Sequence, residues 1–269
     1  MKPSGSLCVI GLGPGAAALL TGQAQEALRR ADVVIGYEGY LAWIADLVGD
    51  KERIALPLTQ ELARAQLAVD RALAGQAVCV VSSGDAGIYG MASLVLEVIE
   101  QRQAAALLTD VLVVPGVSAV NACASLLGAP LGHDFAVLSL SDLLTPWTVI
   151  EKRLTAAAEA DFVMVLVNPK SARRDWQYAR AQEIIAACRA PETPVGVVRN
   201  AYRLDQSVEV TTVARMVEAQ VDMLTTVIVG NSQTRCFQSR LITPRGYPMA
   251  AAGGLRGDST VAPSPSGRG

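Results

Sequence analysis

Histidine is almost absent from this chain, which has a single one, His133, among 269 residues. A histidine-rich metal site is therefore excluded. The five cysteines are scattered and form no Cys-x-x-Cys pair, which favours a reducing compartment over a disulfide framework. No G-x-x-x-x-G-K-[ST] motif occurs, which excludes a P-loop. The sequence thus has neither a metal-ligand cluster nor a Ser-His-Asp or Cys-His set, and we expect no metal.

Charged residues are also scarce, at 18% of the chain, and the formal net charge is -2. This balance gives no electrostatic footprint for nucleic acid. No uncharged run is long enough to span a bilayer, and the first apolar run breaks at a glycine loop, unlike a signal peptide. We therefore expect a cytoplasmic protein that binds neither nucleic acid nor membrane. A hydrophobic content of 51% provides ample material for a core.

The first half of the chain alternates short apolar runs with amphipathic segments. The apolar runs predict strands at 7–12, 32–35, 77–82 and 110–114. The amphipathic periodicity predicts helices at 23–30, 62–74 and 91–102. Alternation of this kind favours a mostly parallel sheet.

The pattern changes in the second half. Ser118 is placed to cap a helix that ends near residue 127. Predicted strands follow at 135–140, 162–167, 194–198, 207–210 and 225–229, and several have no helix between them. We therefore predict an α/β protein with a mostly parallel sheet in residues 1–115 and a mixed sheet in 116–248. The remaining residues, 249–269, are rich in Gly, Ala, Pro and Ser, and are predicted to form a flexible tail.

Five of the predicted strands end in loops of small residues. These loops are Gly11-Leu12-Gly13-Pro14-Gly15, Ser83-Gly84-Asp85-Ala86-Gly87, Pro115-Gly116-Val117-Ser118-Ala119, Asn168-Pro169-Lys170 and Arg199-Asn200-Ala201-Tyr202. Ligands of open α/β sheets bind at the carboxyl ends of the strands. Small residues also let a ligand approach the backbone closely. We expect these loops to form the binding site of a large ligand.

The first loop also matches the G-x-G-x-x-G/A dinucleotide fingerprint, with Glu38 about 20 residues further on. A nicotinamide-dependent oxidoreductase is therefore an alternative function. Two details oppose it. Pro14 removes an amide N–H that a pyrophosphate would need. The helical pattern begins only near Thr21, too late for Gly13 and Ala16 to form the first helical turn.

Taken together, the motifs resemble those of the tetrapyrrole methylases, enzymes of two α/β domains that use S-adenosylmethionine. The first three loops carry this resemblance, together with 132–135 and the longer blocks 139–147, 193–201 and 223–232. These blocks are similar to those of the members that methylate C17 of precorrin-3B with coupled ring contraction in cobalamin synthesis. The resemblance implies a homodimer with its cofactor in the cleft between the domains.

The resemblance also implies which residues contact the cofactor. They come from both predicted domains and are Pro14, Ser83, Gly84, Asp85, Ile88, Ser118, Ala119, Asn168, Ala201 and Thr226.

Ring contraction involves proton movement, so the polar residues of these motifs are candidate acids and bases. They are Asp85, His133, Asp142 and Thr145. Turn-forming roles remain the alternative for the two aspartates and for the histidine.

Precorrins carry many carboxylates, which arginine and lysine side chains recognise. Candidates for substrate binding are Lys170, Arg173 and Arg174, and Tyr89 is the candidate aromatic contact. A solvated helix start remains the alternative for the three cations.

Two questions stay open from the sequence. The macrocycle is either metal-free or cobalt-bearing, and the lack of an iron–sulfur motif favours the metal-free precorrin. A non-catalytic module that binds a tetrapyrrole or an adenosyl ligand is the third candidate function.

Overall fold

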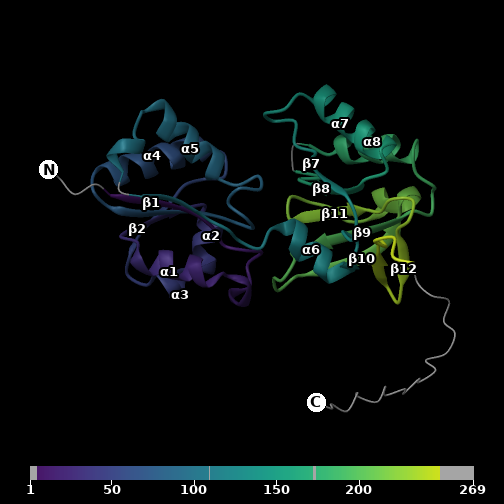
Figure 1. Ribbon diagram of the computed structural model, residues 1–269, viewed down its shortest axis with the longest axis horizontal. Coiled ribbons are helices and arrows are strands. Elements are labelled where there is room, and N and C mark those ends of the chain that lie inside the picture. The colour runs from purple at the N-terminus through teal and green to yellow at the C-terminus, as the bar shows by residue number, and fades with distance from the viewer. Residues whose placement is uncertain (1–4, 109, 172–173, 249–269) are drawn as a thin grey trace, which may run out of the picture.

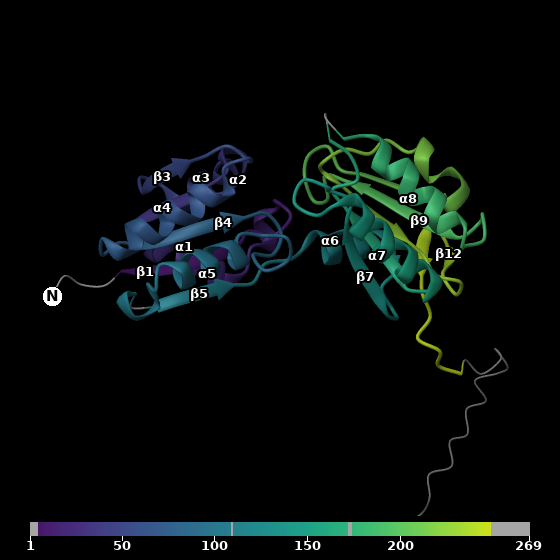
Figure 2. The ribbon, with the colours of Figure 1, turned by 90° about the horizontal axis from the view of Figure 1, so that it is seen from above.

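The computed structural model describes residues 5–108, 110–171 and 174–248, and these form two α/β halves side by side (Figures 1 and 2). The predicted tail at 249–269 lies outside the described residues. The domain boundary near residue 115 stays a prediction. None of the helices in the described ranges is both long and apolar enough to cross a bilayer.

The first half contains a parallel sheet of five strands, as the alternating pattern predicts. The strands are β1 (Ser6–Gly11), β2 (Val33–Gly36), β3 (Glu52–Ala55), β4 (Ala77–Ser82) and β5 (Asp110–Val114), and their spatial order is β3-β2-β4-β1-β5. The edge strand β3 was not predicted, because its side chains are mostly exposed and show no apolar run.

Helices cover both faces of this sheet (Figure 1). One face carries α1 (Gly22–Arg30), α2 (Glu38–Trp43) and α3 (Ala45–Val48), and the other carries α4 (Glu61–Leu73) and α5 (Ala92–Gln101). Successive β1 residues alternate between the two cores: Val9 packs with the α4 side and Ile10 with the α1 side. The short 3-10 helices are η1 (Ala17–Leu19) and η2 (Ala105–Leu107).

The second half contains the mixed sheet that was predicted. Its strands are β7 (Phe135–Ser139), β8 (Val163–Val167), β9 (Pro194–Arg199), β10 (Ser207–Thr212) and β11 (Thr225–Val229), in the order β10-β9-β11-β8-β7. Strands β7 and β8 are parallel, and the other neighbours are antiparallel. One face packs against α7 (Trp147–Glu159), α8 (Trp176–Ala186) and the 3-10 helix η3 (Val213–Glu218), and the other against α6 (Ala119–Leu127).

A small third sheet lies beside the second half. It consists of β12 (Arg235–Phe237), β13 (Arg240–Ile242) and β6 (Gly128–Ala129). The sequence pattern did not predict it, because its strands are short and mostly exposed.

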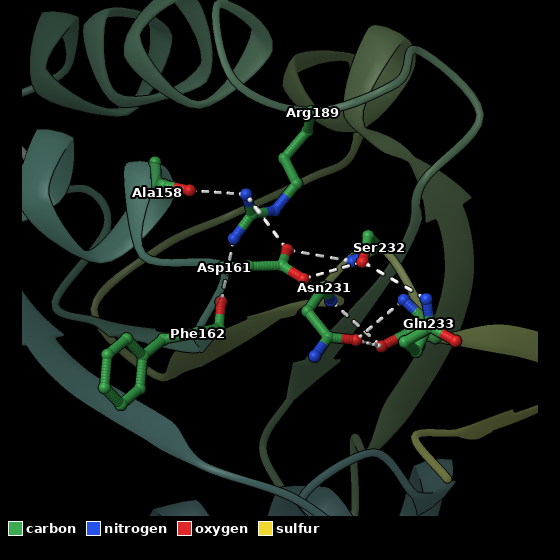
Figure 3. A network of polar contacts seen from close by, with 8 residues as sticks. Ala158, Asp161, Phe162, Arg189, Asn231, Ser232 and Gln233 are labelled. Atoms are coloured by element: carbon green, nitrogen blue, oxygen red, sulfur yellow. Dashed lines mark hydrogen bonds and ion pairs between the residues drawn. The ribbon is translucent and has the colours of Figure 1, made fainter. Parts of the chain in front are cut away.

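A buried arginine ties two turns of the second half together (Figure 3). Arg189 is 7% exposed and donates hydrogen bonds to the carbonyl groups of Ala158 and Phe162. Its guanidinium lies 3.2 Å from the carboxylate of Asp161, which also accepts hydrogen bonds from the N–H and hydroxyl of Ser232. The turn before β8 is thereby fixed to the turn after β11.

Candidate functional site

The loops after β1, β4 and β5 pack backbone against backbone. Gly13 and Gly84 exchange two hydrogen bonds, with N–O distances of 3.0 and 2.7 Å. A Cβ on Gly116 would lie 2.2 Å from the carbonyl oxygen of Gly84 and 2.6 Å from that of Gly11. The glycines therefore allow three loops to meet where a side chain would force them apart.

The first loop does not have the geometry of a dinucleotide site. Helix η1 follows it, and α1 begins only at Gly22, where the Thr21 hydroxyl accepts the N–H of Ala24 at 3.1 Å. The glycines therefore lie outside the first turn of α1. Strand β4 also lies between β1 and β2, whereas the dinucleotide-binding order places those two strands side by side. The oxidoreductase alternative thus lacks structural support.

Asp85 braces two of these loops. Its Oδ1 accepts the N–H of Gly87 at 2.8 Å, and its Oδ2 accepts the N–H of Gly116 at 2.9 Å. Asp85 therefore stabilises the turn after β4, which was the alternative to a direct role in binding or catalysis.

The second sheet presents its own polar edge to these loops. Thr226 pairs with Val167 and Val198, so the amino end of β11 lies beside the carboxyl ends of β8 and β9. The Asn168 side-chain amide donates to the Ser139 hydroxyl at 3.1 Å. Asn168 adopts a φ of 52°, in the left-handed region that asparagine tolerates.

These two edges enclose a cavity of about 280 Å³, here called the loop cavity. Every residue with a predicted cofactor contact lines it: Pro14, Ser83, Gly84, Asp85, Ile88, Ser118, Ala119, Asn168, Ala201 and Thr226. The structure therefore brings together positions as far apart in the sequence as Pro14 and Thr226.

The loop cavity also has lining residues that the sequence analysis missed, among them Tyr40, Cys123 and Arg203. Tyr40 lies on α2, which was not predicted. Cys123 follows Ala119 by one helical turn, so the helical period could have identified it. Burial raises the pKa of the Cys123 thiol to about 11, which keeps it neutral near pH 7.

Arg203 connects the two halves at the loop cavity. Its Nε donates to the carbonyl oxygen of Pro14 at 2.7 Å. Its guanidinium lies 4.2 Å from the ring centroid of Trp43, a distance typical of a cation–π contact. Burial lowers the pKa of this guanidinium, but an arginine stays charged near neutrality. A cation thus fixes the glycine loop from the opposite half.

A second cavity, of about 470 Å³, adjoins the first. This β7 cavity is lined by Val137, Ser139, Leu143, Leu144, Thr145, Ile150 and Arg153, among others, and it shares Tyr89 and Asn168 with the loop cavity. The Tyr89 hydroxyl donates to the carbonyl oxygen of Val137 at 3.3 Å, across the two halves. Of the predicted site residues, Tyr89, Thr145 and Asn168 therefore line this cavity.

His133 is not brought to either cavity. It precedes β7, whereas Ser139, which lines the β7 cavity, ends that strand. Val137, which also lines that cavity, is four residues from His133, or about 13 Å along an extended chain at about 3.3 Å per residue. The Nδ1 atom of His133 accepts the N–H of Asp134 at 2.8 Å. The turn-forming alternative for His133 thus has a hydrogen bond to support it, and its acid–base role stays a prediction without a contact to either cavity.

Arg174 was predicted to bind substrate at the rim of the site, but the structure buries it. It is 8% exposed and donates to the carbonyl oxygens of Leu140 at 2.8 Å and Asn168 at 2.6 Å. Asp142 lies 3.9 Å from its Nε and accepts a hydrogen bond from Gln177 at 2.9 Å. Arg174 therefore holds the Asn168 loop in place, and the catalytic role of Asp142 stays a prediction.

Lys170 and Arg173 were the other two cations predicted to bind substrate. Lys170 is half-buried and lies outside both cavities. Arg173 falls outside the described residues.

An ion pair supports the loop that leads into β11. The Arg199 Nε donates to the carboxylate of Asp222 at 2.6 Å, and the Thr225 hydroxyl and the Leu224 N–H each donate to it at 2.8 Å. Burial alone would raise the pKa of Asp222. The hydrogen bonds outweigh that effect and lower its pKa below the usual value.

We expect acid to remove the stabilising contribution of Asp222. Its pKa is lower in the folded than in the unfolded protein, so the contribution is complete above the unfolded pKa of about 3.9. It is lost as the pH falls through the folded pKa. Thermal unfolding from about pH 7 to about pH 2 should show that Asp222→Asn destabilises the protein near neutrality and progressively less below about pH 4.

Glu218→Gln, which removes the exposed partner of Arg215, is the control and should have little effect. A destabilisation by Asp222→Asn that stays the same over the whole pH range would contradict this expectation.

Comparison with known proteins supports the family resemblance. Residues 6–217 match the model of the family described as Tetrapyrrole (Corrin/Porphyrin) Methylases. The crystal structure of the methyltransferase CobJ matches with a TM-score of 0.84 and 37% identity, over 90% of this chain and 100% of that one.

Three relatives are similar over most of the chain. The cobalt-factor III methyltransferase of Priestia megaterium is 50% identical over 90% of this chain, which spans only 45% of that longer protein. The probable cobalt-factor III C(17)-methyltransferase of Salmonella typhimurium is 49% identical over 90% of this chain and all of that protein. The precorrin-3B C(17)-methyltransferase of a Sinorhizobium species is 41% identical over 92% of this chain and 99% of that protein.

Proposed function

Because the chain belongs to the tetrapyrrole (corrin/porphyrin) methylase family, we propose that it methylates C17 of precorrin-3B in cobalamin biosynthesis, with coupled ring contraction. S-Adenosylmethionine is the proposed methyl donor. The observation that carries the proposal is the pair of adjoining cavities: the loop cavity gathers the predicted cofactor positions, and the β7 cavity lies beside it. Such a pair suits a donor and an acceptor that must meet.

The residues of the loop cavity fit an adenosyl cofactor. Backbone groups, small side chains and apolar side chains such as Ile88 and Leu224 line it, as suits an adenine ring. Helix α6 begins there. The Ser118 hydroxyl accepts the N–H of Asn121 at 3.3 Å. As at every helix start, the first N–H groups have no partner within the helix. We assign the carboxylate of the cofactor to this helix start, where the helix dipole favours an anion.

When bound, the cofactor supplies an electrophilic methyl group, whose transfer requires no metal. The chain supplies position. Tyr89 and Asn168 line both cavities. Arg174 fixes the Asn168 loop by donating a hydrogen bond to the Asn168 carbonyl oxygen. Fixing two reactants at contact distance can remove several kcal/mol from a barrier. Thr145, in the β7 cavity, and Asp85, in the loop cavity, remain candidates for proton transfer during ring contraction.

A cobalt-bearing macrocycle is the second candidate substrate. The relatives named for cobalt-factor III are 50% and 49% identical, compared with 41% for the relative named for precorrin-3B. Comparing kcat/KM for the metal-free and the cobalt-bearing macrocycle tests this choice. The proposal predicts a higher value for precorrin-3B, and a higher value for cobalt-factor III would favour the second candidate.

Calorimetry tests the donor site directly. S-Adenosylhomocysteine is expected to bind with a stoichiometry of one per chain, and NADH is expected not to bind. Binding of NADH in preference to S-adenosylhomocysteine would overturn the proposal.

We expect Arg203→Met to weaken the binding of S-adenosylhomocysteine by about tenfold, the effect of losing about 1.4 kcal/mol. The variant loses both the hydrogen bond to Pro14 and the contact with Trp43, so the first loop is no longer fixed over the cavity. Calorimetric titration measures the change. Arg235→Met replaces an exposed arginine on β12 and is the matched control. Equal affinities for the two variants would contradict the role of Arg203.

A homodimer is also proposed, as the family resemblance implies. Exposed apolar side chains such as Val208 and Phe237 offer surface for such a contact. Light scattering should give twice the mass of one chain.

A further inference from the structure

Arg153 is an exposed arginine on α7 that lines the β7 cavity. Its neighbours one helical turn away cannot pair with it, because they are all apolar: Val149, Ile150, Ala156 and Ala157. Glu151, on the same helix, is already engaged by Arg180, whose Nε donates to it at 2.8 Å. Within the described parts of the chain, no carboxylate forms an ion pair with Arg153. It therefore presents an uncompensated cation to the cavity.

The same cavity has an apolar wall that is open to solvent. Leu143 is 82% exposed and Leu144 is 94% exposed, and both line the cavity. Ile150, on the same helix as Arg153, lies buried in its lining. Two adjacent leucines exposed to this degree contribute little to folding, and an exposed apolar patch beside a polar group is typical of a ligand site. The ligand that fits has a broad apolar face and an anionic edge.

We infer that Arg153 binds a peripheral carboxylate of the macrocycle, while Leu143 and Leu144 cover an apolar face of the same ring. This inference rests on the proposed function and names the residues that hold the acceptor. A guanidinium suits the role because its planar fork can bond both oxygens of a carboxylate. Arg153 thus takes the role that the sequence suggested for Arg174, which is buried and occupied by carbonyl groups.

The position of Arg153 relative to the donor site also fits. The β7 cavity and the loop cavity share Tyr89 and Asn168, so an acceptor held by Arg153 would extend toward the methyl donor. A carboxylate bound in the β7 cavity, beside the donor site, would determine which part of the ring faces the methyl group. Arg153 is therefore proposed as a specificity-determining residue that affects acceptor affinity and leaves donor affinity unchanged.

The test compares Arg153→Gln with Lys152→Gln, which removes a neighbouring exposed cation on the same helix that lies outside the cavity. We expect Arg153→Gln to raise the KM for the macrocycle by about tenfold, which corresponds to about 1.4 kcal/mol. The Kd for S-adenosylhomocysteine should stay at the wild-type value. Arg153→Lys should recover part of the loss, and Lys152→Gln should behave as wild type.

Two further measurements distinguish direct contact with the macrocycle from an indirect effect of the substitutions on the fold. With a macrocycle whose carboxylates are methyl esters, the difference between wild type and Arg153→Gln should disappear. Replacing both Leu143 and Leu144 by Ser should raise KM without lowering the unfolding temperature, because neither side chain is buried in the free protein.

Equal KM values for Arg153→Gln and Lys152→Gln, in a protein whose wild type methylates the macrocycle, would overturn the inference and leave the proposed function intact. A wild type that neither binds S-adenosylhomocysteine nor methylates the macrocycle would overturn both.

Discussion

Gly116→Ala is expected to destabilise the protein by about 3 kcal/mol, the upper part of the range for overpacked sites. The added Cβ would lie 2.2 Å from the carbonyl oxygen of Gly84 and 2.6 Å from that of Gly11. Both obstacles are backbone atoms, so no side chain can rotate away and the three loops must separate. Because these loops line the loop cavity, binding of S-adenosylhomocysteine should fall with stability. Chemical unfolding and calorimetry measure the two effects.

Gly22→Ala provides the matched control. Gly22 begins α1, and a Cβ there would have no atom within 4 Å. This substitution should be neutral or stabilise the protein by up to about 1 kcal/mol. If Gly116→Ala were equally harmless, the three loops would not be in backbone contact, and they would not form the proposed donor site.

Arg189→Met is expected to destabilise the protein by about 2–4 kcal/mol, because it removes a buried charged donor from two carbonyl groups, whereas solvent reaches the 40% exposed carboxylate of Asp161. The substitution removes the donors to Ala158 and Phe162 and leaves the carboxylate of Asp161 without its cation. The network lies at the end of the second sheet opposite the cavities. Protein that remains folded should therefore bind S-adenosylhomocysteine as tightly as wild type. Chemical unfolding and calorimetry measure stability and affinity separately.

Arg180→Met is the control for this change. Arg180 forms ion pairs with Glu151 and Glu183 on the surface, where solvent screens them. We expect nearly unchanged stability. A loss in Arg189→Met no larger than in this control would contradict the importance of the buried network.

Much of the fold could be predicted because the buried strands are continuous apolar runs. β4 and β11, for example, are buried over nearly their whole length and were predicted with their observed bounds. β3 was missed because Ile54 is its only large apolar side chain. β12 and β13 were missed because they are three residues long and largely exposed. Edge and surface strands depend on pairing, which a single sequence does not display.

The two kinds of site residue differed in how well they could be predicted. Positions such as Gly84 and Ala201 follow strands, and strand ends meet at one edge whatever packs around them. The exposure of Arg174 depends on the packing of α8 against the loops after β7 and β8, which no local pattern reveals. His133 could have been predicted to lie away from both cavities, because it precedes a predicted strand and the other candidates follow theirs. Arg153 could not be identified from the sequence, because it differs from its exposed neighbour Lys152 only in lining the β7 cavity.

We expect this chain to transfer a methyl group to C17 of a cobalamin precursor. Incubation with S-adenosylmethionine and precorrin-3B, followed by mass spectrometry and NMR of the product, tests it most directly. The expected product has gained the mass of one methyl group, located at C17 of a contracted ring, and S-adenosylhomocysteine is released. A protein that binds the cofactor yet adds no methyl group to either macrocycle, or adds it at another carbon, would not be a C17-methyltransferase.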